Sequence, residues 1–468
     1  MTLNAMNWNI QQDGDDNNGG GYRTTDPNTD YSLQTSAQLT VTDGATSGIG
    51  VTTLTSATGG FTSAMVGNVV HIYSGTNLTD GWYEIATYVD TNTVTLDRAP
   101  DDGVGGVSGA TCKVGGALAT VGGMGAVWAT EAATRSEPSR AWIKYNATDY
   151  ALTTASYNVA GGSFKQDNAW NFPMSLRGYE TIFGDNPSSN KPTINVGIYN
   201  PSNSPIWLNE SGGQDSGVCS HVKVDGNLKT STYGFYGGDT DGTFYYDCEA
   251  IDCVNGWFVA TTIRCVATGC TSGYQFIVPT KCVAVDCSNR GFNTPTGMVA
   301  DCLAYECGIG FESAPDAIRC VAADCTGDGF EISVGNLTNY VDCVATSNGG
   351  YGFDVAGRSA FVNCYTYNNT SGASDISNLD YMSGPDEVAN ITELSGSPWV
   401  DASADQYWLN DTAGAGATLR AAGIKLPLSG VVDEPDIAAT QHADSAGGSS
   451  SGQTDQNIFL SHIFARTQ

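Results

Sequence analysis

Paired cysteines recur through the second half of the chain, and their spacing limits the possible folds more than any other feature of the sequence. Five pairs share the spacing Cys-x4-Cys, and successive pairs begin about 20 residues apart. The whole series comprises Cys219, Cys248, Cys253, Cys265, Cys270, Cys282, Cys287, Cys302, Cys307, Cys320, Cys325, Cys343 and Cys364. A repeat of this length is typical of solenoids, in which each unit packs against its neighbours.

The repeats have the composition of short strands separated by turns. Cys265 and Cys270 enclose Val-Ala-Thr-Gly, Tyr274 follows a glycine shortly afterwards, and the other units have the same order. Leucine-rich repeats need a leucine framework, which these units lack, and a propeller blade needs about 40 residues. A coil of three short strands fits the spacing, so the sequence predicts an all-β, right-handed parallel β-helix.

Equivalent residues of a parallel β-helix stack because successive coils lie about 4.8 Å apart. Small apolar side chains suit tight inward stacks, so the cysteines are predicted to form a buried ladder of thiols. The aromatic residues that follow glycines are predicted to form a core column rather than a sugar-binding one. This column consists of Trp257, Tyr274, Phe292, Phe311, Phe330 and Phe353.

Two further columns flank each leading cysteine. The residue before it is charged in most units and is predicted to face outward. By strand alternation the residue after it should also face outward, although most members are aliphatic. These members are Glu249, Val266, Val283, Leu303, Val321, Val344 and Tyr365. Because a stack of aliphatic residues in water is unusual, we expect that another segment covers them or that a bend reverses the alternation.

Charge and composition exclude several functional classes. The 468 residues include 49 Asp+Glu and 19 Lys+Arg, which gives a net charge of −30 and opposes nucleic-acid binding. There is no run of 18 apolar residues, so no membrane insertion is expected. The N-terminal residues show no secretory signal, which predicts folding in a reducing host cytoplasm. The cysteines are therefore interpreted as thiols, with disulfides or a metal site as alternatives, and no cofactor is predicted.

The chain is predicted to contain five regions. Residues 1–37 would form the first strand and turn of the β-helix cap, and residues 38–112 a small antiparallel β domain inserted near the N-terminus. Residues 113–372 would form a capping helix and the parallel β-helix, and residues 373–445 a closing region. Residues 446–468 combine a Gly/Ser linker with an apolar tail.

Several segments resemble pectate-lyase-like β-helix proteins. Trp8–Gly20 is similar to their opening strand and turn, and Gly115–Thr120 is similar to the stretch that follows an inserted domain in β-helix proteins of tailed bacteriophages. Asn410–Gly416 and Asp436–His442 resemble the closing motif of that group. The resemblance implies a parallel β-helix, and it implies a virion-associated protein. Parallel β-helices carry many functions, so it does not select an activity.

Carboxylates form the only candidate catalytic pattern. An acidic residue often precedes the second cysteine of a pair, and the candidates, should the chain be an enzyme, are Asp286, Glu306 and Asp324. A calcium site and a solvated acidic face are the alternative interpretations of this column. No catalytic cluster stands out, and no catalytic triad can be built from the four histidines, which lie far apart in the sequence.

The leading functional hypothesis is a non-catalytic structural component of a tailed-phage virion, such as a capsid decoration, head-fibre or tail-associated protein. A tailspike-type polysaccharide lyase or glycosidase is the first alternative, and a glycan-binding adhesin is the second. The expected partners are further copies of the chain, other virion proteins and, for the alternatives, surface glycans. The predicted interface is the apolar tail, with Ile458, Phe459, Leu460, Ile463 and Phe464.

Overall fold

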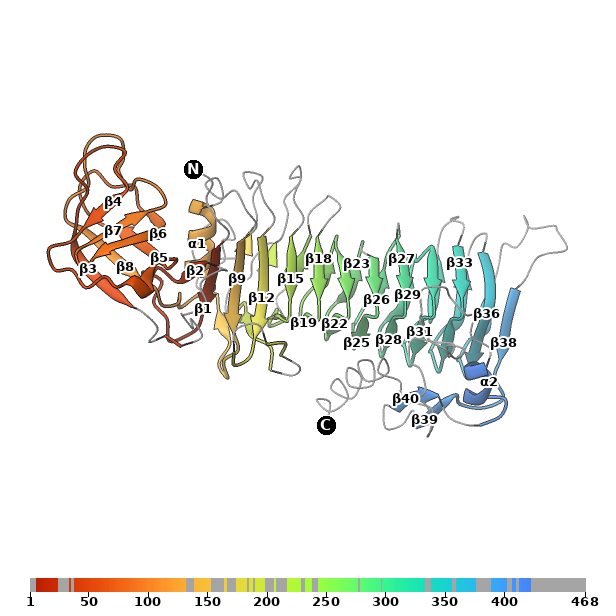
Figure 1. Ribbon diagram of the computed structural model, residues 1–468. Coiled ribbons are helices and arrows are strands. Elements are labelled where there is room, and N and C mark those ends of the chain that lie inside the picture. Colours follow the sequence, from red (N-terminus) through yellow and green to blue (C-terminus); the bar gives the residue numbers. More distant parts are fainter. Residues whose placement is uncertain are drawn as a thin grey trace. The chain divides into compact units, whose positions relative to one another are not determined.

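The computed structural model describes residues 6–421 except for 24–32, 35–37, 132–138, 153–163, 166–173, 183–184, 188–189, 198–205, 208–216, 229–231, 238–242, 277, 296, 333–337, 356–358, 376–388, 402–405 and 410–411. The chain divides into two compact units, Met1–Glu249 and Ala250–Gln468. Both units are built almost entirely of strands, most of them in parallel ladders (Figure 1). The predicted parallel β-helix is confirmed.

The first unit contains the inserted antiparallel sheet, as predicted. Its strand order is β3-β8-β5-β6-β7-β4, and a short 3₁₀ turn, η1 (Ser63–Met65), lies between β4 and β5. The strands are β3 (Leu39–Gly44), β4 (Thr53–Thr55), β5 (Val69–Tyr73), β6 (Gly81–Asp90), β7 (Thr93–Leu96) and β8 (Ala110–Val114). Alternate residues such as Leu54, Ile72 and Ile85 form one buried apolar cluster, so this sheet has its own core.

The remaining strands of the first unit form parallel coils, beginning with β1, which pairs with β9 in parallel, except that β2 pairs with β1 in antiparallel. These strands are β1 (Met6–Ile10), β2 (Gly21–Arg23), β9 (Ser139–Lys144), β10 (Tyr150–Ala151), β11 (Phe164–Lys165), β12 (Met174–Tyr179), β13 (Thr193–Asn195), β14 (Ile206–Trp207), β15 (Val218–Ser220), β16 (Lys223–Asp225), β17 (Tyr233–Tyr236) and β18 (Phe244–Tyr246). Helix α1 (Val121–Glu131) follows the inserted sheet. The Thr120 hydroxyl accepts the Gly123 N–H at 2.9 Å, which caps the start of this helix.

The second unit is a parallel β-helix whose coils each contribute one strand to three stacks (Figure 1). The first stack contains β21 (Thr261–Ile263), β24 (Val278–Thr280), β27 (Met298–Ala300), β30 (Asp316–Ile318), β33 (Thr338–Val341) and the start of β36 (Ser359–Tyr367). The second contains β19 (Glu249–Ile251), β22 (Val266–Thr268), β25 (Val283–Val285), β28 (Leu303–Tyr305), β31 (Val321–Ala323), β34 (Val344–Thr346), the end of β36 and β38 (Ala389–Glu393). The third contains β20 (Asn255–Phe258), β23 (Ser272–Gln275), β26 (Arg290–Asn293), β29 (Ile309–Glu312), β32 (Phe330–Ile332), β35 (Tyr351–Val355) and β37 (Gly372–Asp375). The closing elements are β39 (Trp399–Asp401), β40 (Gln406–Leu409) and α2 (Gly416–Ala421).

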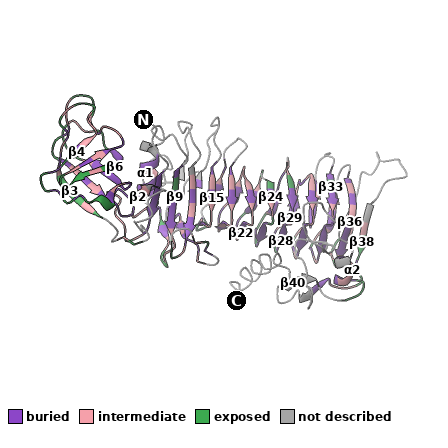
Figure 2. Cartoon of the chain, viewed as in Figure 1, coloured by how far each residue is buried: buried purple, intermediate pink, exposed green. Residues whose placement is uncertain are grey.

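The core of the second unit consists of stacked identical positions, which appear as buried residues along the coils in Figure 2. The aromatic column of the third stack is fully internal, as predicted. Phe311 lies between Phe292 and Phe330, with ring centroids 4.8 and 4.7 Å away and planes within 7°. The centroid distances match the coil spacing, so each ring packs on the next without a gap.

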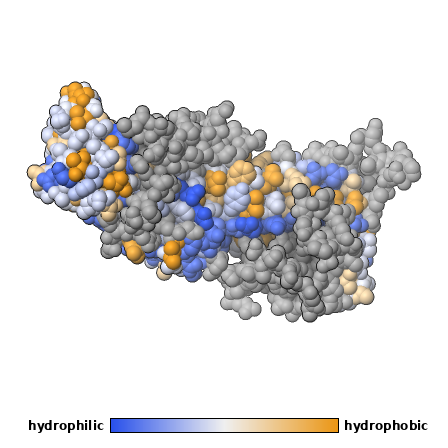
Figure 3. Space-filling model, viewed as in Figure 1, coloured by the Kyte–Doolittle hydropathy of each residue, from blue (hydrophilic) through white to orange (hydrophobic). Residues whose placement is uncertain are grey.

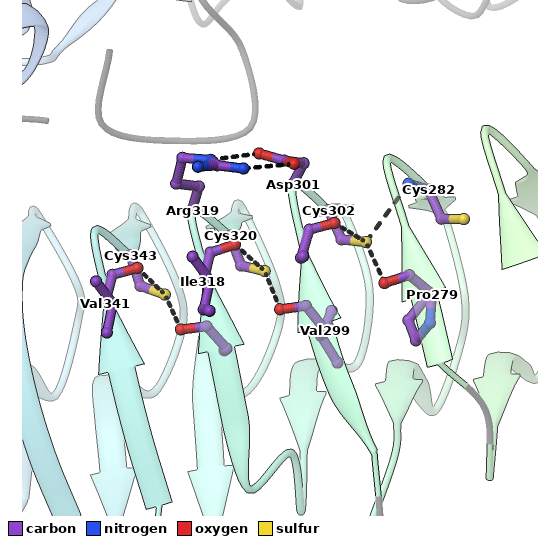
Figure 4. A network of polar contacts seen from close by, with 12 residues as sticks. Pro279, Cys282, Val299, Asp301, Cys302, Ile318, Arg319, Cys320, Val341 and Cys343 are labelled. Carbon is purple, nitrogen blue, oxygen red and sulfur yellow. Dashed lines mark hydrogen bonds and ion pairs between the residues drawn. The ribbon is translucent and has the colours of Figure 1, made fainter. Parts of the chain in front are cut away.

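The cysteines are all buried as thiols. Figure 4 shows the ladder at the corner between the first and second stacks. The sulfur of Cys302 lies 3.1 Å from the carbonyl oxygen of Ala300 and 3.6 Å from that of Pro279 on the preceding coil. Cys320 and Cys343 have equivalent contacts, so each thiol reaches carbonyls of its own coil and of the coil before it. A thiol is a small apolar group with a weak donor, which suits this corner better than a methyl group.

Charged residues occupy the same corner just before the cysteines. Lys281, Asp301 and Arg319 have φ values of 55°, 55° and 53°, so the chain turns there in the left-handed region. Arg319 donates from Nε and Nη2 to the two carboxylate oxygens of Asp301 at 2.5 and 2.7 Å (Figure 4). Each of these two side chains is only 15% exposed, so the pair is more buried than the exposed column expected from sequence. The hydrogen bonds that Arg319 donates to Asp301 raise the pKa of Arg319.

The outer face of the second stack is covered by the closing elements of the same chain. Val321 is fully buried and belongs to an apolar cluster with Leu394, Trp399 and Leu419. The indole N–H of Trp399 donates to the Thr346 hydroxyl at 3.0 Å, which fixes the ring over this face. Two explanations were expected for the aliphatic column, a covering segment or a bend that reverses the strand alternation. The structure shows a covering segment here, and the strand alternation is retained.

Candidate functional site

The predicted carboxylates lie at the corner between the second and third stacks. Asp286, Glu306 and Asp324 each follow a strand of the second stack and have a φ of 51°. Glycine, serine and asparagine occupy the same place in other coils, as Gly269 does with a φ of 63°. Asp and Asn tolerate the left-handed region better than most residues, so the turn itself accounts for much of this acidic column.

The surroundings of these three carboxylates do not suggest a catalytic pair. Asp286 and Glu306 are exposed, and Asp324 is half-buried. The Tyr305 hydroxyl donates to the Glu306 carboxylate at 2.9 Å. Within the described residues, no group of three or more His, Cys, Asp or Glu side chains is arranged to hold a metal ion.

A different column is more distinctive, and sequence analysis did not identify it. It lies on the outer face of the third stack, one residue after the buried aromatic column, and we call it the outer column. Strand pairing places its members in register on consecutive coils. The members are Phe258, Gln275, Asn293, Glu312, Glu331 and Asp354, and the register continues from Asp354 to Asp375 of β37.

The last three members of the outer column are carboxylates that face one another across adjacent strands. Glu331 pairs in register with Glu312 on one side and with Asp354 on the other. The backbones of neighbouring coils lie about 4.8 Å apart, so these side chains leave the sheet next to one another. Like charges directly opposite each other destabilise a sheet, so such a run is costly unless one group stays protonated.

Glu331 is the group whose protonation is favoured. Burial is the main cause that raises its pKa, and repulsion from Glu312, Asp328 and Asp354 raises it further. Arg290 lowers it again, but the net direction remains upward. A half-buried carboxyl with a raised pKa next to ionised carboxylates is a common property of catalytic acids.

Glu312 has the opposite environment, because Arg290 forms an ion pair with it. The side chain of Glu312 is 18% exposed and that of Arg290 is 24% exposed, while the Oε2 atom of Glu312, which faces Arg290, is buried. Asp328 lies close by and accepts the backbone N–H of Tyr351 at 2.5 Å, which holds the loop before β35. The site thus combines an acid of raised pKa with a neighbouring carboxylate whose negative charge is stabilised by a cation.

A signal for this site was present in the sequence. Glycine, an aromatic residue and then an acid recur at Gly310–Glu312, Gly329–Glu331 and Gly352–Asp354. The aromatic residue of each unit is predicted to lie in the core, and the residue after it forms a second column that the sequence analysis does not consider. Strand alternation places that next residue on the outer face, so the three acids could have been aligned.

The Asp-rich turn of the first unit has a structural role. Both carboxylate oxygens of Asp16 are engaged, because Oδ1 accepts the backbone N–H groups of Ala119 and Thr120 at 2.9 Å and Oδ2 accepts the Thr120 hydroxyl at 2.6 Å. Asp15 pairs with Lys113 at 2.9 Å, and the backbone hydrogen bond from Asn17 together with Lys113 lowers its pKa. These contacts connect the turn to the segment that enters helix α1.

No known family model matches the chain, and no curated protein matches its sequence. Among solved structures, the chain is similar to the A-module of mannuronan C-5 epimerase AlgE4 of Azotobacter vinelandii, with 13% identity, 50% of this chain and 70% of that chain covered, and a TM-score of 0.35. It is similar to pectate lyase Pel9A, with 15% identity, coverage of 67% and 90%, and a TM-score of 0.38. It is also similar to the catalytic unit of a GH87 α-1,3-glucanase from Streptomyces thermodiastaticus, with 10% identity, coverage of 77% and 87%, and a TM-score of 0.28.

These neighbours are carbohydrate-active enzymes, and the likeness concerns the fold. Over the part of the chain that the structure describes, no helix has the length and apolar character needed to span a membrane. The tail residues predicted as an interface, 457–466, lie outside the described residues.

Proposed function

We propose that the second unit hydrolyses glycosidic bonds at the carboxylate end of the outer column. The observation that carries this proposal is Glu331, whose pKa is raised by burial and by the carboxylates on the adjacent coils. Protonation of the leaving oxygen by such a group is the first step of glycoside hydrolysis. The proposal corresponds to the polysaccharide lyase or glycosidase alternative of the sequence analysis. It places the catalytic residues in the outer column and not at the corner that holds Asp286, Glu306 and Asp324.

A retaining mechanism is the one we assign to this pair. Retaining glycosidases place their two carboxyl groups about 5–5.5 Å apart, whereas inverting enzymes need about 6.5–9.5 Å to admit a water molecule. Glu331 and Glu312 pair in register on adjacent strands, whose backbones lie about 4.8 Å apart, so we assign the pair to the more closely spaced class. In this assignment Glu331 is the general acid, and Glu312, held by Arg290, is the nucleophile.

The proposal is tested by incubating the full chain with a panel of soluble polysaccharides. We expect new reducing ends and no unsaturated products, because hydrolysis adds water whereas a lyase eliminates. Proton NMR of the first products should show the anomeric configuration of the substrate. If no polysaccharide in a broad panel is cleaved, or if the products are unsaturated, the hydrolase assignment is wrong.

A structural role in the virion of a tailed phage is the second candidate. The burial of all fourteen cysteines as thiols favours it, because thiols stacked on adjacent coils fit folding in a reducing host cytoplasm. In this role the apolar tail would dock on another copy of the chain or on another virion protein. A virion-associated hydrolase would combine both candidates.

Deleting residues 454–468 tests the docking of the tail. We expect the shortened chain to keep its melting temperature and to lose its association with particles, because the removed apolar side chains would contribute to contacts with a partner. The measurements are thermal unfolding of the free protein and its copy number in purified particles. A large fall in melting temperature with normal incorporation would show instead that the tail stabilises its own chain.

A further inference from the structure

The outer column begins with an aromatic platform at the end opposite the carboxylates. The rings of Phe258 and Phe276 meet edge to face, with centroids 5.5 Å apart. Phe276 is 43% exposed, and next to it Val278 and Met298 are 39% and 43% exposed. Figure 3 shows hydrophobic residues gathered over the strands around β24, the strand that begins at Val278. Large apolar residues that remain exposed together on neighbouring coils indicate a binding surface.

The platform is continuous with the proposed hydrolytic site. Phe258 pairs in register with Gln275, which pairs with Asn293, which pairs with Glu312. Along the axis of the second unit the order is therefore an aromatic ring, the half-buried amide of Gln275, the buried amide of Asn293 and then carboxylates. A ring followed by an accessible amide that can both donate and accept hydrogen bonds suits the face and the hydroxyl groups of a sugar.

The charge of this surface limits the glycans that it can bind. The run of Glu312, Glu331 and Asp354 offers no cation to an acidic sugar, because Arg290 is engaged by Glu312, and the chain net charge of −30 repels uronic acids and sulfated sugars. Like-charge contacts disfavour the binding of such a ligand. Uncharged sugar residues avoid this penalty.

We infer that the outer column is a track for an extended glycan without acidic groups, which lies parallel to the coil axis with one sugar ring on Phe258 and Phe276 and the cleaved bond at Glu331. The inference rests on the proposed hydrolysis, because it specifies the substrate class of that site. The aromatic platform then acts as a remote binding subsite that aligns the chain over the carboxylates.

Binding can be tested separately from cleavage by using the Glu331→Gln variant, in which turnover should be blocked. The probes are an array of neutral polysaccharides and an array of uronic-acid polysaccharides, followed by titration of the best ligand. We expect binding only to neutral members, and about tenfold weaker binding in the Glu331→Gln/Phe276→Ala double variant. The matched control is Glu331→Gln/Val104→Ala, which removes an exposed apolar side chain that is 75% exposed in the first unit.

The possible outcomes separate the two proposals. Binding only to uronic-acid polysaccharides, or to none of the arrays, would overturn the inferred track. Cleavage of a neutral glycan with no effect of Phe276→Ala would overturn the platform and leave the hydrolase assignment intact. Neutral-glycan binding that depends on Phe276, without cleavage by the unmodified chain, would support the track and contradict hydrolysis. Dissociation of an oligomer by Phe276→Ala, without loss of glycan binding, would make the patch a contact between copies and overturn the platform.

Discussion

Replacing Glu331 with glutamine is expected to lower the rate of reducing-end release about 10²–10⁴-fold. Glutamine keeps the size of the side chain but cannot donate a proton to the leaving oxygen, so substrate binding should be largely retained. The measurement is the initial rate at saturating substrate, compared with that of the unmodified chain. Glu306→Gln is the matched control, because Glu306 is an exposed carboxylate at a corner of the same unit and lies outside the outer column.

The pH dependence of stability gives a second result for the same variant. The raised pKa of Glu331 means that folding favours its protonated form. Its contribution to stability is complete below the pKa of the unfolded chain and is lost as the pH rises through the higher folded pKa. At neutral pH, Glu331→Gln should therefore be at least as stable as the unmodified chain. An active variant, or one that unfolds, would contradict the assigned role.

Replacing Phe311 with alanine is expected to lower the free energy of unfolding by about 3–5 kcal/mol. The ring is 1% exposed and packs between Phe292 and Phe330 at centroid distances of 4.8 and 4.7 Å, so its removal leaves a cavity between two coils. Stacked coils cannot easily collapse onto the space, because the backbone ladders hold their separation. Denaturant unfolding measures the loss.

The control for this core prediction is Phe276→Ala, which removes the same side chain from a position that is 43% exposed. We expect a much smaller loss of stability there, because a large part of this residue is already in contact with water. Equal losses for the two variants would mean that the aromatic column is not the main packing contact of the coils.

The fold could be predicted because its constraints are repeated in every coil. Each unit places a cysteine at a tight corner and an aromatic residue after a glycine, and several copies of the same pattern make the period visible. The cover of the second stack was anticipated from Val321 and its equivalents. Trp399, which supplies part of that cover, could not be identified, because it lies in a segment without the repeat.

The site was harder to predict because its residues lie far apart in the sequence and become neighbours only through the register of paired strands. Asp286 and Glu306 are candidate catalytic carboxylates by their position before a cysteine. The left-handed backbone conformation of that turn is sufficient to explain acidic residues there. The pKa of Glu331 is raised first by burial and then by carboxylates that include Glu312 and Asp354 on the adjacent coils, and neither effect can be read from sequence order alone. The pairing of Glu312 with Arg290 likewise required coordinates.

The assignment of Glu331 as the acid of the site is tested most directly by measuring its pKa. Carbon-13 labelling of the glutamate carboxyl groups in the full chain, with Glu331→Gln to assign the signal, allows an NMR titration of this one group. We expect a pKa above that of an ordinary glutamate, which falls towards the ordinary value when Asp354 is replaced by asparagine. A pKa at or below the ordinary glutamate value would contradict the assignment, because folding would then not favour the protonated form of Glu331.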